Sequence, residues 1–302
     1  MPFLTCFAQK RKNYKSSKVY CSLLLITIKF KLMNLLKTEW LKIKKYPAFW
    51  AIIGITALSY PGINFISYSG YQNVIHKKGQ GAQIAKILLG NPFTFPEVWH
   101  TVAYFSSLFV FIPSVVVIML ITNEYSYKTN RQNIIDGWSR NQFMVSKLID
   151  VLIVTLLISV LCFIVSNIIG IINIDVSNVN RWRLSYYAGL FTLQTFAQLS
   201  LAFLVGFLVR RAFIALGIFI FYFIVLENIA IGILRYYNYD FRRFLPLAIS
   251  NRLIPAPVFF AKFDEAAYNK ALTNITPHIL YTIILTAAVW LICFRVNNKR
   301  DL

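Results

Sequence analysis

Six long apolar stretches constrain the fold of this 302-residue chain more than any other feature. A helix needs about 20 apolar residues to cross the ~30 Å hydrocarbon core of a bilayer, and continuous apolar runs favour helices over the alternating segments of a transmembrane barrel. The sequence therefore predicts an all-α integral membrane protein with six transmembrane helices. These expected spans cover residues 48–68, 102–121, 151–174, 186–209, 212–234 and 277–294.

The composition excludes an ordinary soluble domain. Charged residues make up 14% of the chain and hydrophobic residues 58%, whereas soluble domains carry about 25% charged residues. In a soluble protein the formal net charge of +20 would suggest nucleic acid binding. In a membrane protein, basic residues instead set the orientation and meet anionic lipid, so we expect membrane lipid and no nucleic acid among the partners.

The distribution of basic residues predicts the orientation, since cytoplasmic loops carry an excess of Lys and Arg. With a cytoplasmic N-terminus, 13 Lys and Arg fall in about 50 inside residues and 11 fall in nearly 90 outside residues. We therefore expect a multi-pass protein of the cell (inner) membrane with both termini in the cytoplasm.

Residues 1–32 differ from the rest of the chain. They hold seven Lys and Arg and no acid, and their apolar run 19–28 is too short to cross a membrane. We interpret residues 1–32 as a disordered basic leader or the product of a wrongly assigned start, with 33–302 as the six-span domain; a membrane-surface anchor is the alternative. Residues 34–46 carry apolar side chains at helical spacing among lysines, which predicts an N-terminal interfacial helix.

The connection between the second and third spans, residues 123–147, has the signals of a helical bend. Gly137 is a natural helix stop, and Ser139 with Gln142 forms the sequence pattern of a capping box. The segment therefore predicts a short helix, a sharp turn at Gly137–Trp138 and a second helix that leads into the third span. Such a bend can pass the movement of a cytoplasmic partner into a spanning helix; a plain polar connection is the alternative.

The same segment resembles the coupling-helix region of the ABC-2 type permeases, the membrane subunits of ATP-binding-cassette exporters, and is closest to the bacitracin-resistance and lantibiotic-immunity branch. The resemblance is carried by Asn123-Glu124-Tyr125, Thr129-x-Arg131-Gln132-Asn133-Ile134-Ile135-x-Gly137-x-Ser139-Arg140 and Ser146-Lys147. One departure is Lys128, where many relatives carry glycine.

The resemblance implies a function for this segment and a partner for the chain. It implies that a separate ATP-binding-cassette ATPase subunit docks at a cytoplasmic coupling helix. It also implies a homodimer or a heterodimer with a second permease, because one six-span subunit forms half of the pathway. The residues expected to couple to the ATPase are Glu124, Arg131, Gln132, Asp136, Gly137, Ser139 and Arg140.

Polar residues within the expected spans are candidates for a substrate path. Glu227 and Asn228 are adjacent polar residues of the fifth span. Insertion of an acidic side chain such as Glu227 into the membrane costs about 2.5–3.5 kcal/mol, so Glu227 should face the bundle, a partner or water. A structural role is the alternative, at the outer interface or paired with Arg235. Gln194 and Gln198 share one helix face, a pattern more typical of helix packing than of ligand binding.

The outside connection before the last span contains an apolar stretch, 244–260, that prolines interrupt. It is too broken to span the membrane. We expect a re-entrant or interfacial hairpin that caps the outer mouth, as the resemblance also implies, or a loop packed on the membrane surface.

Chemistry that would make the chain an enzyme is scarce. There is no phosphate-binding G-x-x-x-x-G-K-[ST], no paired cysteine spacing and no histidine cluster. We therefore expect no catalytic residue, metal or cofactor, and any energy input must come from a partner or an ion gradient. The resemblance implies a permease that moves an unidentified substrate by alternating access with energy from the ATPase partner. The alternatives are an intramembrane enzyme that uses Glu227 and a histidine such as His278, and a gradient-driven carrier.

Overall fold

The computed structural model describes residues 41, 44, 47–76, 90–173, 180–237, 239–257 and 265–299, with side chains of the last range from 268 onward. The chain divides into two units, 1–47 and 48–302, and the second unit contains the apolar bundle. The expected leader 1–32 lies outside the described residues, as does most of the expected helix 34–46. Of that helix only Leu41 and Lys44 are described, and both are helical and exposed.

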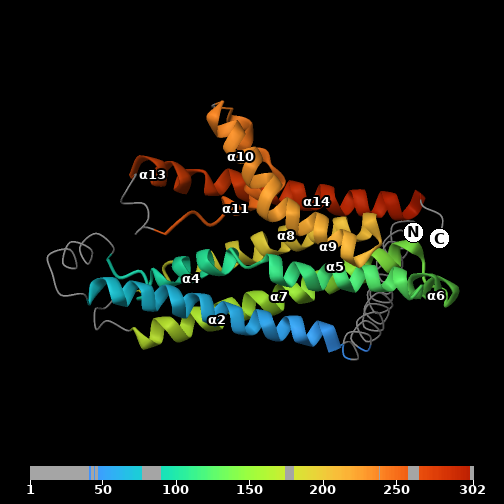
Figure 1. The fold of residues 1–302 in the computed structure, drawn as a ribbon, viewed down its shortest axis with the longest axis horizontal. Coiled ribbons are helices and arrows are strands. Elements are labelled where there is room, and N and C mark those ends of the chain that lie inside the picture. The colour runs from blue at the N-terminus through green and yellow to red at the C-terminus, as the bar shows by residue number, and fades with distance from the viewer. Residues whose placement is uncertain are drawn as a thin grey trace, which may run out of the picture. The chain divides into compact units, whose positions relative to one another are not determined.

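The structure confirms the all-α prediction, since the described residues form helices and no strand (Figure 1). Five helices are long and apolar enough to cross a membrane, and a bent helix pair provides a sixth span if it is counted as one. The unbroken spans are α2 (Pro47–Ile75), α7 (Arg140–Ile172), α8 (Tyr186–Val209) and α14 (Ile275–Lys299). The fifth joins α9 (Ala212–Phe221), the π-helix η1 (Tyr222–Leu226) and α10 (Glu227–Tyr236).

The expected span 102–121 is two helices rather than one. α4 (Val98–Ser107) and α5 (Phe111–Ser126) meet at an angle of 50°. Pro113 is the third residue of α5, a place where a missing backbone N–H does least harm. In the preceding turn the N–H groups of Phe109 and Val110 bond to carbonyls three residues earlier, which tightens the chain. Pro113 therefore accompanies the break in the second span, at a place where the new helix α5 tolerates it.

The core of the bundle is organised around α8. This helix contacts α4, α5, α7, α9 and α14, and it has the largest buried share of the spans. Phe203 stacks on Trp290 of α14 with ring centroids 4.9 Å apart, and the Trp290 indole N–H donates to the Ser200 hydroxyl at 3.0 Å. Helices α2 and α9–α10 are mostly exposed; Phe213, for instance, is 92% exposed. Exposed apolar faces of this kind suit lipid or a second subunit.

The proline-interrupted stretch 244–260 after the fifth span is described up to residue 257, and its first part belongs to short helices. These are η2 (Asp240–Phe244) and α11 (Pro246–Asn251), and α13 (Glu265–Thr273) precedes α14. Residues 247–250 of α11 are buried, and α11 contacts α8 and α14. The stretch therefore inserts between spans, which favours the re-entrant interpretation over a surface loop.

Candidate functional site

The α5–α7 bend, residues 124–147, has the predicted form: a short helix α6 (Thr129–Ile135), a turn and the start of α7. Both ends of α6 are marked by left-handed backbone, with φ of +55° at Lys128 and +92° at Gly137. Ser139 begins α7 with a complete capping box: its hydroxyl accepts from the Gln142 N–H at 3.3 Å, and its own N–H donates to Gln142 Oε1 at 3.0 Å. Local sequence signals therefore determine the path of the chain here.

The left-handed conformation at Lys128 explains why glycine is expected at this place. Lys128→Gly should stabilise the purified protein by less than about 1 kcal/mol, because glycine adopts this backbone without a Cβ clash. We expect a small rise in Tm in a neutral detergent. The matched change Lys299→Gly lies in the last turn of α14 and should lower or leave Tm unchanged. A lower Tm for Lys128→Gly would contradict the inference that the left-handed backbone at Lys128 is strained.

Helix α6 lies at the surface of the protein. None of its residues is buried, and Ile135 is 78% exposed. Of the seven residues expected to contact an ATPase, Arg131, Gln132, Asp136, Gly137 and Ser139 are exposed. The Gln132 amide donates to Asp136 Oδ1 at 3.2 Å, one helical turn away. Trp138, at the turn after α6, is half-buried.

The other two expected contact residues are tied to the bundle. Glu124 is 7% exposed and bonds to α7, as described below. The Arg140 guanidinium donates to the Asn298 carbonyl at 2.9 Å, and the Asn297 amide donates to the Arg140 carbonyl at 2.9 Å. The start of α7 is therefore fastened to the end of α14.

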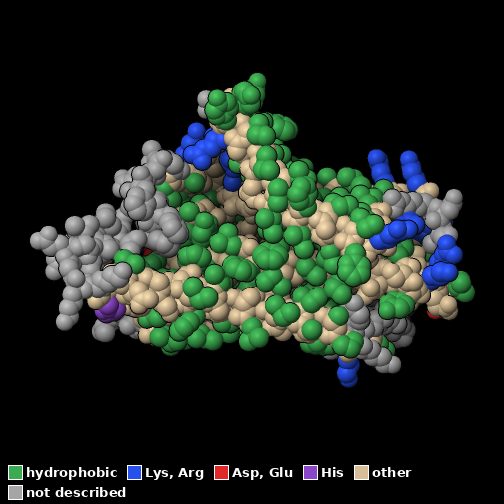
Figure 2. Space-filling model, viewed as in Figure 1, with side chains coloured by type: hydrophobic (Ala, Val, Ile, Leu, Met, Phe, Trp, Pro, Cys, Tyr) green, Lys and Arg blue, Asp and Glu red, His purple; other side chains and the backbone are tan. Residues whose placement is uncertain are grey.

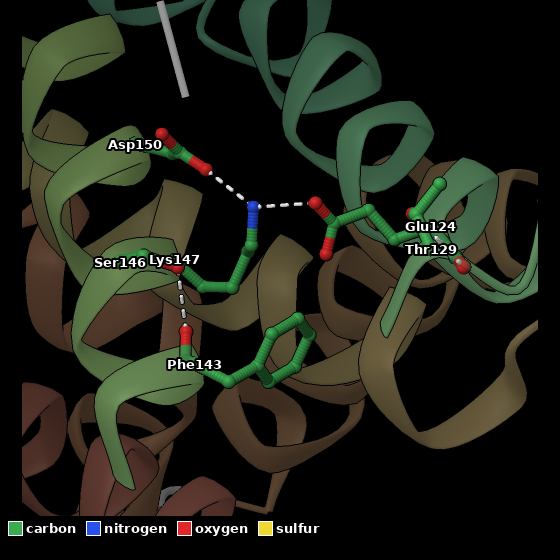
Figure 3. A network of polar contacts seen from close by, with 6 residues as sticks. All are labelled: Glu124, Thr129, Phe143, Ser146, Lys147 and Asp150. Atoms are coloured by element: carbon green, nitrogen blue, oxygen red, sulfur yellow. Dashed lines mark hydrogen bonds and ion pairs between the residues drawn. The ribbon is translucent and has the colours of Figure 1, made fainter. Parts of the chain in front are cut away.

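A buried cluster of three charged side chains joins α5 to α7 next to the bend (Figure 3). Lys147 Nζ lies 2.8 Å from Glu124 Oε1 and 2.8 Å from Asp150 Oδ2, and Lys147 is only 3% exposed. Because a buried charge without its partner is strongly destabilising, this cluster locks the end of α5 to the first turns of α7. The resemblance implied a contact of Glu124 with the ATPase, and it gave neither Lys147 nor Asp150 an individual role. The available signal was their i, i+3 spacing beside an apolar run.

Glu227 bonds to the N-terminus of α11. Its carboxylate oxygens accept the Leu247 N–H at 3.1 Å and the Ala248 N–H, and the residue is 3% exposed. The first N–H groups of a helix have no intrahelical acceptor and carry partial positive charge, so a buried carboxylate is stabilised there. Among the described residues no hydrogen bond or ion pair joins Glu227 to Arg235 or to His278. Glu227 directly follows the π-helix η1, an irregularity frequent at functional sites.

Gln194 and Gln198 hold the other end of α11. Their amides donate to Asn251 Oδ1 at 3.0 and 2.7 Å, and Gln198 also lies 3.3 Å from the Ser250 hydroxyl. Beyond α11, His100 Nε2 lies 2.8 Å from the Pro255 carbonyl. Side chains from α10, α8 and α4 therefore position the inserted segment.

A cavity of about 530 Å³ lies beside α11. Its wall includes Glu227, Asn228, Asn251 and Arg252, with apolar surface from Phe223 and others. Asn228 is exposed, and its amide donates to the Ile224 carbonyl of its own helix at 2.8 Å. Two of the four candidate substrate-path residues thus line this cavity, and the other two fix one of its walls. Among the described residues no group of three or more His, Cys, Asp or Glu could hold a metal ion.

Comparison with known proteins identifies the family. The model of the ABC-2 family transporter proteins matches residues 35–226, which is well over half of the chain. The chain belongs to the ABC-2 family. The matched region runs from before α2 to the end of η1, so it contains the α5–α7 bend and ends before Glu227 and α11. Together with the apolar helices, ABC-2 membership shows a multi-pass membrane protein of a transport family, whose permeases typically work with an ATPase partner.

A curated relative of this ABC-2 protein is the uncharacterized protein YhcI of Bacillus subtilis (strain 168). It is 27% identical over 173 residues, which cover 47% of this chain and 55% of YhcI. The chain thus spans about half the length of the curated relative that it matches.

Proposed function

We propose that this ABC-2 protein is the permease subunit of an ATP-driven exporter, in which a separate ATPase powers alternating access. The observation that carries the proposal is the exposed helix α6, held between α5 and α7 by the buried Glu124–Lys147–Asp150 cluster. A displacement of α6 would move both spanning helices together, because their ends are fastened to each other. The tie from Arg140 to α14 would extend the movement to the last span.

The coupling residues divide into two roles under this proposal. Arg131, Gln132, Asp136, Gly137 and Ser139 form the surface that meets the ATPase, since their side chains or backbone are exposed. Glu124 and Arg140 position the bend from inside the chain. This assignment requires α6 and both termini in the cytoplasm, as the distribution of Lys and Arg predicts.

The substrate path would run past the cavity beside α11. Glu227 and Asn228 would line it, while Gln194 and Gln198 would hold α11 as its outer wall. Two permeases, identical or different, would complete the pathway in the cell membrane through the exposed faces of α2 and α9–α10. The functional domain would comprise residues 33–302, and peptide antibiotics of the bacitracin and lantibiotic type are the substrates to test first.

The decisive experiment is reconstitution with an ATP-binding-cassette ATPase, sought first among the genes next to the one that encodes this chain. We expect the two proteins to co-purify, and we expect candidate substrates to stimulate ATP hydrolysis in proteoliposomes. Transport that continues undiminished without any ATPase would overturn the proposal.

Substitution of Gly137 tests the coupling surface. Gly137→Val should reduce substrate-stimulated ATP hydrolysis at least about tenfold, because a β-branched residue is strained at φ of +92° and the turn after α6 would shift. Membrane insertion should stay intact, as measured by the yield of monodisperse protein. The matched change Gly217→Val lies in α9, where an added Cβ meets no atom within 4 Å, and should leave coupling unchanged. Equal coupling in both variants would contradict the assigned role of the turn.

A further inference from the structure

A second cavity, of about 410 Å³, lies at the end of the bundle that carries α6. Four cationic side chains line it: Lys128, Arg131, Arg210 and Arg211. Figure 2 shows Lys and Arg side chains gathered at this end of the molecule. Its volume falls in the range of about 300–1,000 Å³ that is typical of small-ligand sites.

The charge of this cavity has no counterpart among its described lining residues, which include no acid. The two carboxylates of the adjoining bend do not line the cavity, and Glu124 is paired with Lys147. Four like charges around one cavity repel one another, and this repulsion would be relieved by a bound anion.

Among the described residues, the Arg210 guanidinium has a free N–H donor for such an anion. Its guanidinium lies 4.7 Å from the centre of the Tyr125 ring, so the ring holds it in place. Its Nε–H is buried and has no hydrogen-bond acceptor in the part of the chain that the structure describes. Its backbone is left-handed, with φ of +60°, which is uncommon for a residue other than glycine.

The position of the cavity at the ends of two candidate spans indicates the kind of anion. Arg210 directly follows Val209, the last residue of the 24-residue span α8, and Arg211 directly precedes α9. Arg210 and Arg211 thus lie between the ends of two candidate membrane spans, and we infer that they are close to the level of the lipid phosphates. Phe143, Phe207 and Val209 add apolar surface to the same cavity.

We propose that this cavity binds a phosphate group, through Arg210 and Arg211 with Arg131 and Lys128 beside them. The membrane depth and the apolar wall favour the headgroup of an anionic phospholipid as its source over a soluble phosphate. Basic pockets between membrane helices bind lipid headgroups in the same way, by charge and by paired N–H donors.

The test is equilibrium binding to the full-length protein in a neutral detergent, followed by native mass spectrometry. The probes are dihexanoyl-phosphatidylglycerol, dihexanoyl-phosphatidylcholine and inorganic phosphate. We expect phosphatidylglycerol to bind, and phosphatidylcholine to bind at least about tenfold more weakly. Added salt should weaken the binding of phosphatidylglycerol, because it screens the charges. Inorganic phosphate that competes at the affinity of the lipid would support the phosphate site and identify a soluble source. Equal binding of the two lipids would overturn the proposal.

Variants then locate the site. Arg210→Gln with Arg211→Gln should weaken phosphatidylglycerol binding at least about tenfold, because two charged donors are lost. The matched change Arg295→Gln removes an exposed cation that does not line the cavity and should leave binding unchanged. Arg211→Gln alone changes only an exposed side chain, so it tests the site even if the double variant fails to fold. Unchanged binding in Arg211→Gln and in the double variant would overturn the proposal.

Discussion

Replacement of Lys147 by methionine is expected to destabilise the protein by about 3–5 kcal/mol, the typical cost of breaking a buried ion pair from one side. The change would leave the Glu124 and Asp150 carboxylates buried next to each other without the ammonium group that lies 2.8 Å from each. The measurement is the Tm and the yield of monodisperse protein in detergent. We expect the Lys147→Met variant to be largely misfolded or aggregated.

Two further variants separate the charge cluster from a general loss of lysine. Lys299→Met removes an exposed lysine at the end of α14 and should leave Tm unchanged. The triple variant Glu124→Gln, Lys147→Met, Asp150→Asn removes all three charges, so it should be more stable than Lys147→Met alone. Wild-type Tm in the single variant would show that the cluster does not hold α5 to α7.

Replacement of Glu227 by leucine is expected to free α11 from the bundle. The Leu247 and Ala248 N–H groups would then be buried without their acceptor, and hydrogen bonds to a charged group are worth about 1.5–3 kcal/mol each. We expect hydrogen–deuterium exchange of these two amides to rise at least about tenfold. Glu227→Gln keeps one acceptor oxygen and should give an intermediate rate.

The neighbouring change Asn228→Leu is the control for this exchange measurement. The Asn228 amide bonds to its own helix, so exchange at Leu247 and Ala248 should stay at the wild-type rate. If Glu227→Leu exchanges no faster than Asn228→Leu, the carboxylate does not hold α11. Transport in Glu227→Gln separates a permease from an intramembrane enzyme, since an enzyme with a catalytic Glu227 would lose all activity.

Each expected range of a continuous span overlaps one long apolar helix of the structure. The range 186–209 coincides with α8, and α14 extends the range 277–294 by a few residues at each end. Agreement is poorest at the second span, where Pro113 lies near a bend of 50°. The sequence shows how long each apolar stretch is, but it does not show whether a proline breaks the helix. Pro61 leaves α2 unbroken, whereas Pro113 of α5 accompanies a break. The packing around each proline decides between these outcomes.

Site residues were predictable where their signals are local. The capping box of Ser139 and the stop at Gly137 depend on residues within one turn, so the bend could be derived before any contact was known. The partners of the buried polar groups could not. Gln194 and Gln198 share a helix face in any helix, but that pattern does not say that Asn251, more than 50 residues later, occupies it.

The sequence by itself determined that this chain is a helical membrane protein, where its spans lie and where the α5–α7 bend turns, because hydrophobic length and helix capping act over neighbouring residues. Only the tertiary structure decided which groups surround each charge. Lys147 joins Glu124 and Asp150, Glu227 holds α11, and Arg210 and Arg211 share a cavity with two other cations. These pairings depend on which helices pack side by side, since a buried charge takes the partner that the fold brings within reach.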